Sequence, residues 1–171
     1  MSEPAKSHAT ARCSCGSVEL NVIGAAITSV ACYCDDCQQG SRMIDELPNA
    51  PPVLEVDSGT AYVLYRKDRV ECVKGAQFLK SYKINDQSAT NRAVATCCNS
   101  AMYMSFDDGR HWVPVYRARL RGDAPSLQMR IQTKFKSGNS DIPKDVPSYS
   151  GYPLRFLAKL IAAWIPMLLH R

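Results

Sequence analysis

Three cysteines within a six-residue run are the part of the sequence best suited to chemistry. Cys32, Cys34 and Cys37 have the spacing Cys-x-Cys-x-x-Cys. Zinc prefers thiolate ligands, and three thiolates this close in sequence can cap one face of a tetrahedral ion. A structural zinc has four protein ligands, whereas a catalytic zinc has three and keeps one position for water or substrate. The presence or absence of a fourth donor therefore decides which kind of site this is.

The other cysteines also favour metal binding. The chain has eight cysteines in 171 residues, and seven of them lie in tight groups. Very short loops make poor disulfides but good metal chelates. The first ten residues contain no apolar run of the signal-peptide kind, so we expect reduced thiols and a cytoplasmic protein. The remaining groups are Cys13 with Cys15 and Cys97 with Cys98, while isolated Cys72 is expected to be a small buried apolar residue.

Few residues are candidates for the fourth donor to Cys32, Cys34 and Cys37. The chain has three histidines, at positions 8, 111 and 170, and none lies near this run. Cys97 can join either group, because adjacent cysteines share a metal only where the backbone turns sharply between them. In one hypothesis it completes a separate set with Cys98, and the chain binds two zinc ions. In another, Cys97 or a non-cysteine donor closes the run 32–37, and the zinc is structural. In a third, Cys98 alone joins Cys13 and Cys15, and that site is weak or empty.

The remaining pattern predicts a mainly β protein with small antiparallel sheets. Hydrophobic residues make up 46% of the chain and charged residues 22%, as in ordinary globular domains. Short strand-like runs, one of them at 53–56, are separated by turn residues. We predict a disordered tail at 1–11, a zinc-binding β domain at 12–136, a linker at 137–153 and an amphipathic helix at 154–171.

Two aspartates lie inside the cysteine run. Asp35 or Asp36 is expected to cap a short helical turn through Cys37, which Gly40 then interrupts. The alternative is that these carboxylates relay protons at the metal.

Two further segments suggest partners. Residues 110–136 hold seven basic residues against one acid, which suits an anionic substrate, a membrane surface or nucleic acid, or forms ordinary solvated strands. Residues 154–171 have a broad apolar face with Trp164, opposite Arg155 and Lys159. Such a helix is too short to span a membrane; it either packs on protein or lies in a membrane interface.

The order of these cysteine motifs resembles the glutathione-dependent formaldehyde-activating enzyme family, which includes the centromere protein V relatives. The motifs are Cys13-Ser14-Cys15-Gly16 and Cys32-Tyr33-Cys34-Asp35-Asp36-Cys37-Gln38, and the resemblance covers residues 12–106. It implies a β-tent fold, a catalytic zinc on the run 32–37, and a structural zinc on Cys13, Cys15 and a distal pair. The chain departs from the family at that pair. Ala95 occupies the first ligand position, and Asn99 follows Cys97-Cys98 where glycine is usual.

The resemblance implies a carbon–sulfur lyase that forms or cleaves thiol–aldehyde adducts of the S-hydroxymethylglutathione type. Its partners would be a small thiol such as glutathione and a small aldehyde, with Cys32, Cys34 and Cys37 as the catalytic zinc ligands. Metal coordination deprotonates a thiol, which suits this chemistry. Two alternatives compete: a non-enzymatic zinc-stabilised module that binds nucleic acid or protein, and a scaffold peripheral to the membrane, attached through 154–171.

Overall fold

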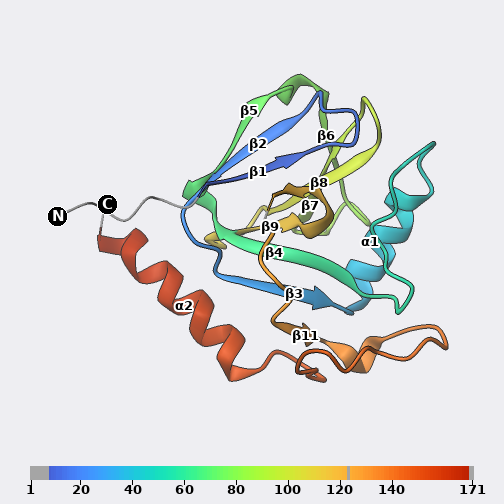
Figure 1. The fold of residues 1–171 in the computed structure, drawn as a ribbon, viewed down its shortest axis with the longest axis vertical. Helices are drawn as coiled ribbons and strands as arrows, with labels where there is room; N and C mark the ends of the chain where they lie inside the picture. The colour runs from blue at the N-terminus through green and yellow to red at the C-terminus, as the bar shows by residue number, and fades with distance from the viewer. Residues whose placement is uncertain (1–7, 123, 170–171) are drawn as a thin grey trace.

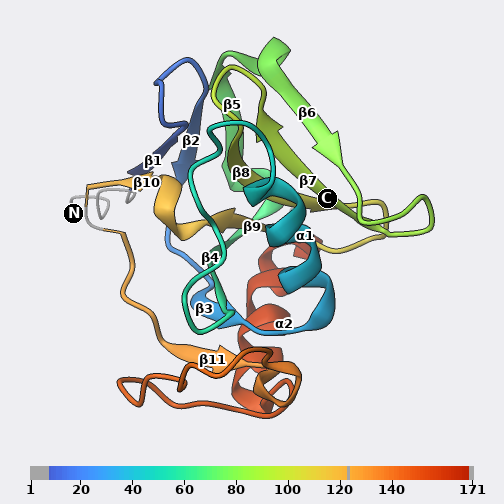
Figure 2. The same cartoon turned by 90° about the vertical axis from the view of Figure 1, so that its right-hand side faces the viewer.

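The computed structural model describes residues 8–122 and 124–169, and it has two β-sheets and two α-helices. The predicted mainly β class is confirmed. The sheets form separate layers, with the four-stranded sheet at one end of the molecule and strand β11 at the other (Figure 2). The predictions for residues 1–7 and for His170 lie outside the described residues.

The seven-stranded sheet is antiparallel except at one edge, where β11 runs parallel to β3. Cys32 lies at the end of its strand β3, and Cys97 and Cys98 lie just after its strand β7. In sheet order its strands are β11 (Met129–Ile131), β3 (Thr28–Cys32), β4 (Thr60–Arg66), β9 (Trp112–Tyr116), β8 (Ser100–Phe106), β7 (Thr90–Ala95) and β6 (Leu79–Tyr82).

The four-stranded sheet includes part of the segment predicted as a tail. Strand β1 pairs with both β10 and β2, so residues 8–11 are ordered, contrary to the composition-based expectation. The reason is that Ala11 is fully buried and packs in the core between the sheets. The strands in sheet order are β10 (Leu120–Arg121), β1 (His8–Arg12), β2 (Glu19–Ile23) and β5 (Val70–Lys74).

The side chains of β4 alternate between two hydrophobic cores, as the period of a strand requires. Val63 and Tyr65 belong to the core shared with the four-stranded sheet, which also contains Cys13. Tyr62 and Leu64 belong to the core on the other face, which contains Cys32, Cys37 and residues of the C-terminal helix. Each cysteine group therefore borders its own core.

Helix α1 (Asp35–Asp45) differs from the sequence prediction in two ways. It continues through Gly40 instead of ending there, because the buried Arg92 side chain packs against Gly40 and the helix gains tertiary support. Its N-cap is Cys34, with no side-chain capping bond from either aspartate.

The predicted strand at 53–56 is also wrong. The backbone N–H groups of Val53 and Leu54 donate to the Asp45 carboxylate, at 2.8 and 3.2 Å, rather than to a neighbouring strand. Four short 3₁₀ helices lie at Lys67–Arg69, Ala76–Phe78, Arg117–Arg119 and Thr133–Phe135.

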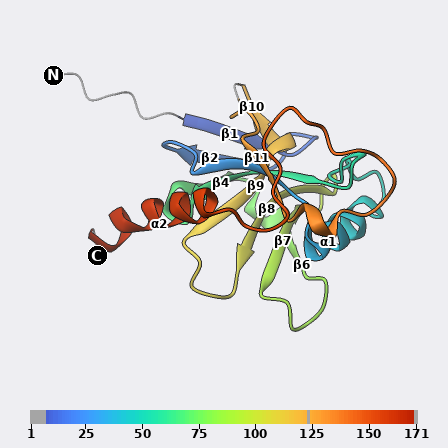
Figure 3. The ribbon, with the colours of Figure 1, turned by 90° about the horizontal axis from the view of Figure 1, so that it is seen from below.

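Helix α2 (Leu154–Leu169) lies on the opposite side of the domain from α1 (Figure 1, Figure 3). It packs against the core through Phe156 and Leu160, which are each 6% exposed. Residues 137–153, predicted as a linker, run beside β11 and form an isolated bridge between Arg130 and Ser148. Over the described part of the chain, neither helix combines the length and apolar character needed to cross a membrane.

Candidate metal centres

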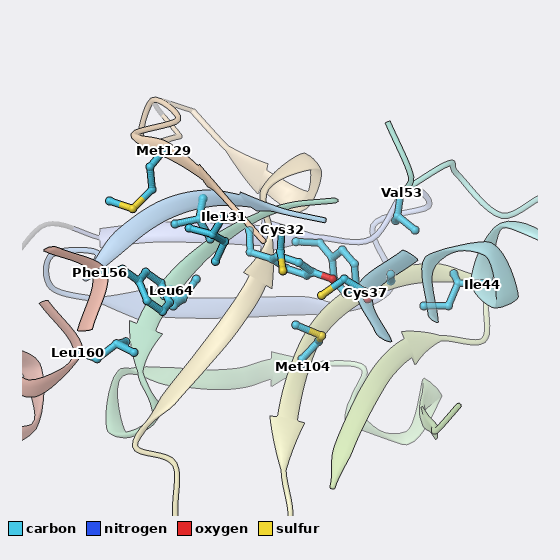
Figure 4. Packing of buried hydrophobic residues seen from close by; sticks show 14 of the residues in the cluster. Cys32, Cys37, Ile44, Val53, Leu64, Met104, Met129, Ile131, Phe156 and Leu160 are labelled. Atoms are coloured by element: carbon cyan, nitrogen blue, oxygen red, sulfur yellow. The ribbon is translucent and has the colours of Figure 1, made fainter. Parts of the chain in front are cut away.

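Cys32, Cys34 and Cys37, hereafter the triad, come together where β3 passes into α1. Cys32 is the last residue of β3, Cys34 is the N-cap of α1, and Cys37 lies in the first turn of that helix. Their sulfur atoms all lie within 4.8 Å of one another. Cys32 and Cys37 are buried and Cys34 is half-buried. Figure 4 shows the sulfur atoms of Cys32 and Cys37 directed toward the same interior space, close to Met104.

Within residues 8–122 and 124–169, no fourth histidine, cysteine or carboxylate joins the triad. His111 is engaged elsewhere, because its Nε2 donates to the backbone carbonyl of Leu160 at 2.7 Å. Cys97 is also engaged elsewhere, as described below. The triad is thus a set of three sulfur donors.

The triad favours one thiolate in particular. Hydrogen bonds from the Cys32 and Cys37 thiols, with a smaller contribution from the Arg92 guanidinium, lower the pKa of Cys34 to about 3. The pKa of Cys37 is raised to about 12. Its hydrogen bond with Cys32 acts to lower this pKa, but the hydrogen bond with Cys34 and the burial of the thiol together raise it by more. The site therefore stabilises the thiolate form of Cys34, which is the form that binds a soft cation.

Cys13, Cys15, Cys97 and Cys98, hereafter the quartet, form the second group. Cys13 and Cys15 follow β1, and Cys97 and Cys98 lie in the turn between β7 and β8. The sulfur of Cys97 is 3.4 Å from that of Cys15, 3.9 Å from that of Cys13 and 3.9 Å from that of Cys98. Cys97 thus lies with Cys98, and the triad does not share it.

A sharp turn brings the adjacent thiols Cys97 and Cys98 to one place. The backbone N–H of Cys98 donates to the carbonyl of Ala95 at 3.2 Å, and Asn99 has a left-handed φ of 51°. Asparagine tolerates this conformation better than most residues other than glycine. Ala95 is fully buried at the end of β7.

The sulfur spacing of the quartet fits a tetrahedral metal. Metal–sulfur bonds of about 2.3 Å give a tetrahedron with an edge of about 3.8 Å. The separation of 3.6 Å between the Cys13 and Cys15 sulfur atoms is close to that edge, as are the three distances to Cys97. Both cysteine groups could hold a metal ion, and their all-sulfur donor sets suit a soft or borderline one.

A cavity of about 390 Å³ extends from the triad toward α2. All three triad cysteines line it, together with Asp36, Arg92 and Arg110. The rest of its wall is largely apolar. Its main apolar residues are Leu64, Met104, Phe106, Trp112, Phe156, Leu157 and Leu160.

Arg92 on β7 places a buried positive charge beside the triad. It is 1% exposed, and its Nη2 donates to the carbonyl of Asp36 at 2.6 Å. Its Nε and Nη1 have no hydrogen-bond partner among the described residues. Three thiolates around a divalent cation leave one net negative charge, which a buried guanidinium offsets electrostatically.

Sequence reasoning found both cysteine groups but missed the cavity. The apolar period of 154–171 predicted a buried face without indicating that it covers the triad. Arg92 carried no signal of burial. The sequence allows Asp36 to act as a cap or as a proton relay, and in the structure it lies on the cavity wall without a capping bond.

The basic segment 110–136 does not form one continuous basic surface. Arg119 and Arg130 are buried, at 7% and 4% exposure. Arg130 donates to Asp145 at 2.5 Å and to the Tyr33 hydroxyl at 3.1 Å. Its guanidinium is therefore engaged by partners within the protein and does not add to a basic surface. Among the basic residues of this segment, Arg110 is the one that lines the cavity beside the triad.

Comparison with known proteins agrees with these motifs. Residues 8–47 match the family model of the glutathione-dependent formaldehyde-activating enzyme. No curated protein matches the chain. The chain is similar to a crystal structure of a Rhodobacter sphaeroides protein, with 16% identity, a TM-score of 0.49, and coverage of 82% of this chain and 99% of that one. Over residues 8–47, which hold the triad and the first two thiols of the quartet, the chain therefore has the sequence pattern of the glutathione-dependent formaldehyde-activating enzyme family, as its motifs predicted.

Proposed function

We propose that this protein is a zinc-dependent carbon–sulfur lyase that forms and cleaves adducts between a small thiol and an aldehyde. One observation carries the proposal: a set of three cysteines borders a cavity, while a separate set of four cysteines supplies a full set of four donors of its own. Three ligands suit a metal that also binds substrate, and four suit a structural one. The quartet, which borders the core between the sheets, is accordingly assigned the structural zinc.

The reaction needs no redox partner. Zinc held by the triad would supply a coordination position at which a substrate thiol loses its proton at neutral pH. The thiolate sulfur then donates an electron pair to the carbonyl carbon, and a carbon–sulfur bond forms as the carbonyl π bond breaks. The oxygen takes up one proton, so thiol and aldehyde together become a hydroxyalkyl thioether. Cleavage is the reverse.

Three charged residues on the cavity wall are assigned roles in this reaction. Asp35 and Asp36 are both adjacent to a triad cysteine, but Asp36 is the one that lines the cavity, so we assign it the proton transfer. Arg92 offsets the negative charge of the cysteine ligands. The Arg110 guanidinium is partly exposed and borders the same cavity; its Nε pairs with Asp108 at 3.0 Å, and its other N–H groups suit a carboxylate of glutathione.

The test is the rate of adduct exchange. Zinc-loaded protein, glutathione and ¹³C-formaldehyde would be studied by NMR exchange spectroscopy, with the uncatalysed rate subtracted. Faster exchange is expected for the wild type and for Cys72→Ser, which changes a cysteine outside both groups. Cys34→Ser should abolish the acceleration. If the wild type gives no acceleration with glutathione or another small thiol, or if Cys34→Ser leaves it unchanged, the proposal is wrong.

A second hypothesis concerns the outer face of α2, and it is compatible with the first. Ile161, Ile165 and Leu168 are 57%, 51% and 47% exposed, which favours peripheral contact with a membrane. Co-sedimentation with anionic vesicles would test this, using Ile161→Glu against Ala162→Glu as the matched control. If only Ile161→Glu reduces sedimentation, the hypothesis is supported. Equal behaviour of the two variants would contradict it.

A nucleic-acid-binding module is less well supported, because two of the arginines on which it rested are buried. It predicts DNA binding that weakens steeply with salt, which the lyase hypothesis does not require.

A further inference from the structure

We infer that the cavity beside the triad takes the apolar chain or ring of an aldehyde of about six carbons, rather than formaldehyde alone. The inference rests on the proposed function for the reaction. For the substrate class it rests on the size and lining of the cavity.

The size of the cavity exceeds what a one-carbon aldehyde requires. Its volume is about 390 Å³. An apolar cavity of about 150 Å³ is large enough to hold benzene. A carbonyl group bound at the triad would therefore leave room for a ring or a chain on its substituent side. With formaldehyde, the apolar wall formed by Leu64, Phe156 and Leu160 would contact no carbon chain of the aldehyde.

The lining of the cavity is polar at the triad and largely apolar away from it, where Arg110 lies over the Phe106 ring. The Arg92 guanidinium donates a hydrogen bond to the backbone carbonyl of Asp36, in the first turn of α1 and next to Cys37. Figure 4 shows Leu64, Phe156 and Leu160 grouped on one side of Cys32 and Cys37. A substrate with a reactive polar end and an apolar body matches this order.

Helix α2 supplies the far wall of the cavity and is held firmly in place. Phe156 and Leu160 are buried in the core, and His111 donates to the Leu160 carbonyl at 2.7 Å. The Trp164 ring stacks on His111 with a centroid distance of 5.8 Å. The apolar wall is therefore a fixed part of the fold.

Two further side chains suit an apolar substrate of variable shape. Met104 lines the cavity next to the triad, and methionine adapts readily to irregular apolar surfaces. Leu157 both lines the cavity and is 40% exposed, so it marks a point where the apolar wall reaches solvent.

Straight-chain primary amides provide a test that needs neither thiol nor turnover. Acetamide, butanamide and hexanamide keep the carbonyl group but are not electrophilic. Their dissociation constants would be measured on the full chain by ligand-observed NMR. Affinity should rise about fourfold for each added methylene, the effect of burying one such group. A flat series on the wild-type protein would overturn the inference without any variant.

Variants on α2 locate the binding. Leu157→Ala should weaken hexanamide binding about three- to tenfold and leave acetamide binding unchanged. The matched control is Ile161→Ala, on the same helix but outside the cavity lining. Equal effects of the two variants on hexanamide would contradict the proposed location.

The two proposals fail separately. Accelerated formaldehyde exchange without chain-length-dependent amide binding would overturn the substrate class and leave the lyase function standing. Chain-length-dependent amide binding without accelerated exchange of formaldehyde or hexanal would overturn the lyase function and leave the apolar site standing.

Discussion

Arg92 of β7 packs directly against Gly40 of α1, and no other residue type fits at that helix position without displacing it. A Cβ added to Gly40 would lie 2.6 Å from Arg92 Nη2 and closer still to its Nε and Cζ. This contact lets the guanidinium reach the carbonyl of Asp36 and stay beside the triad. The glycine that local propensity marks as a helix breaker is thus what allows a buried charge to approach the metal site.

Gly40→Ala tests this contact, because its expected sign is opposite to that of helix propensity. In an ordinary helix the change stabilises by about 0.5–1 kcal/mol. Here we expect it to lower the free energy of unfolding by about 2 kcal/mol through overpacking. Chemical denaturation measures this. Gly109→Ala is the control, since a Cβ there meets no atom within 4 Å, and should change stability by less than about 1 kcal/mol.

Metal content should distinguish the two cysteine groups. We expect two zinc ions per wild-type chain and one in Cys97→Ser, since Cys97 lies with the quartet. Elemental analysis of protein purified with zinc measures this, and Cys72→Ser should keep both ions. A Cys97→Ser protein that still holds two zinc ions would show that Cys97 is not a ligand.

The two groups should also differ in their effect on folding. Cys13→Ser should lower the melting temperature and lose one metal together, because Cys13 is 1% exposed in the core between the sheets. Cys34→Ser should lose the other metal at a smaller cost, because Cys34 is half-buried beside a cavity. Thermal unfolding with and without a chelator compares them. Greater damage from Cys34→Ser than from Cys13→Ser would contradict the structural assignment of the quartet.

The docking of α2 predicts a contrast between neighbouring positions. Leu160→Ala should cost about 2–4 kcal/mol of unfolding free energy, since this side chain is 6% exposed in the core. Ile161→Ala, at 57% exposure, should change stability by less than about 0.5 kcal/mol. Urea unfolding of both variants measures the difference. Similar small values would mean that α2 does not depend on this contact.

Asp145 predicts one component of acid sensitivity. The hydrogen bond from Arg130 lowers the pKa of its carboxyl group. A lowered folded-state pKa contributes stability above the ordinary carboxyl pKa of about 3.9, and this contribution is lost as the pH falls through the folded-state value. Asp145→Asn should therefore lose less stability than wild type between pH 5 and pH 2. The control is Asp141→Asn, which changes another exposed carboxylate; its loss of stability over this pH range should equal that of the wild type.

Much of the site could be predicted because its ligands are short-range. Cys32, Cys34 and Cys37 are close in sequence, so their convergence needs only the end of a strand and the first turn of a helix. The mainly β class followed from short alternating runs. At Gly40 and at β1, contacts with residues distant in sequence overrode the local preference. At residues 53–56, the nearby Asp45 carboxylate accepts the backbone N–H bonds that a strand would need.

The sequence by itself determined that most of the thiols lie in short motifs, and it determined the family whose motifs they follow. It did not determine to which group Cys97 belongs, since that depends on a turn that places Cys97 and Cys98 against Cys13, 84 positions away from Cys97. Nor did it determine that α2 forms part of the wall of the cavity beside the triad, or that the Arg92 side chain packs against Gly40. These are long-range relationships, and they arise only when the sheet brings β7, α1 and α2 around one core.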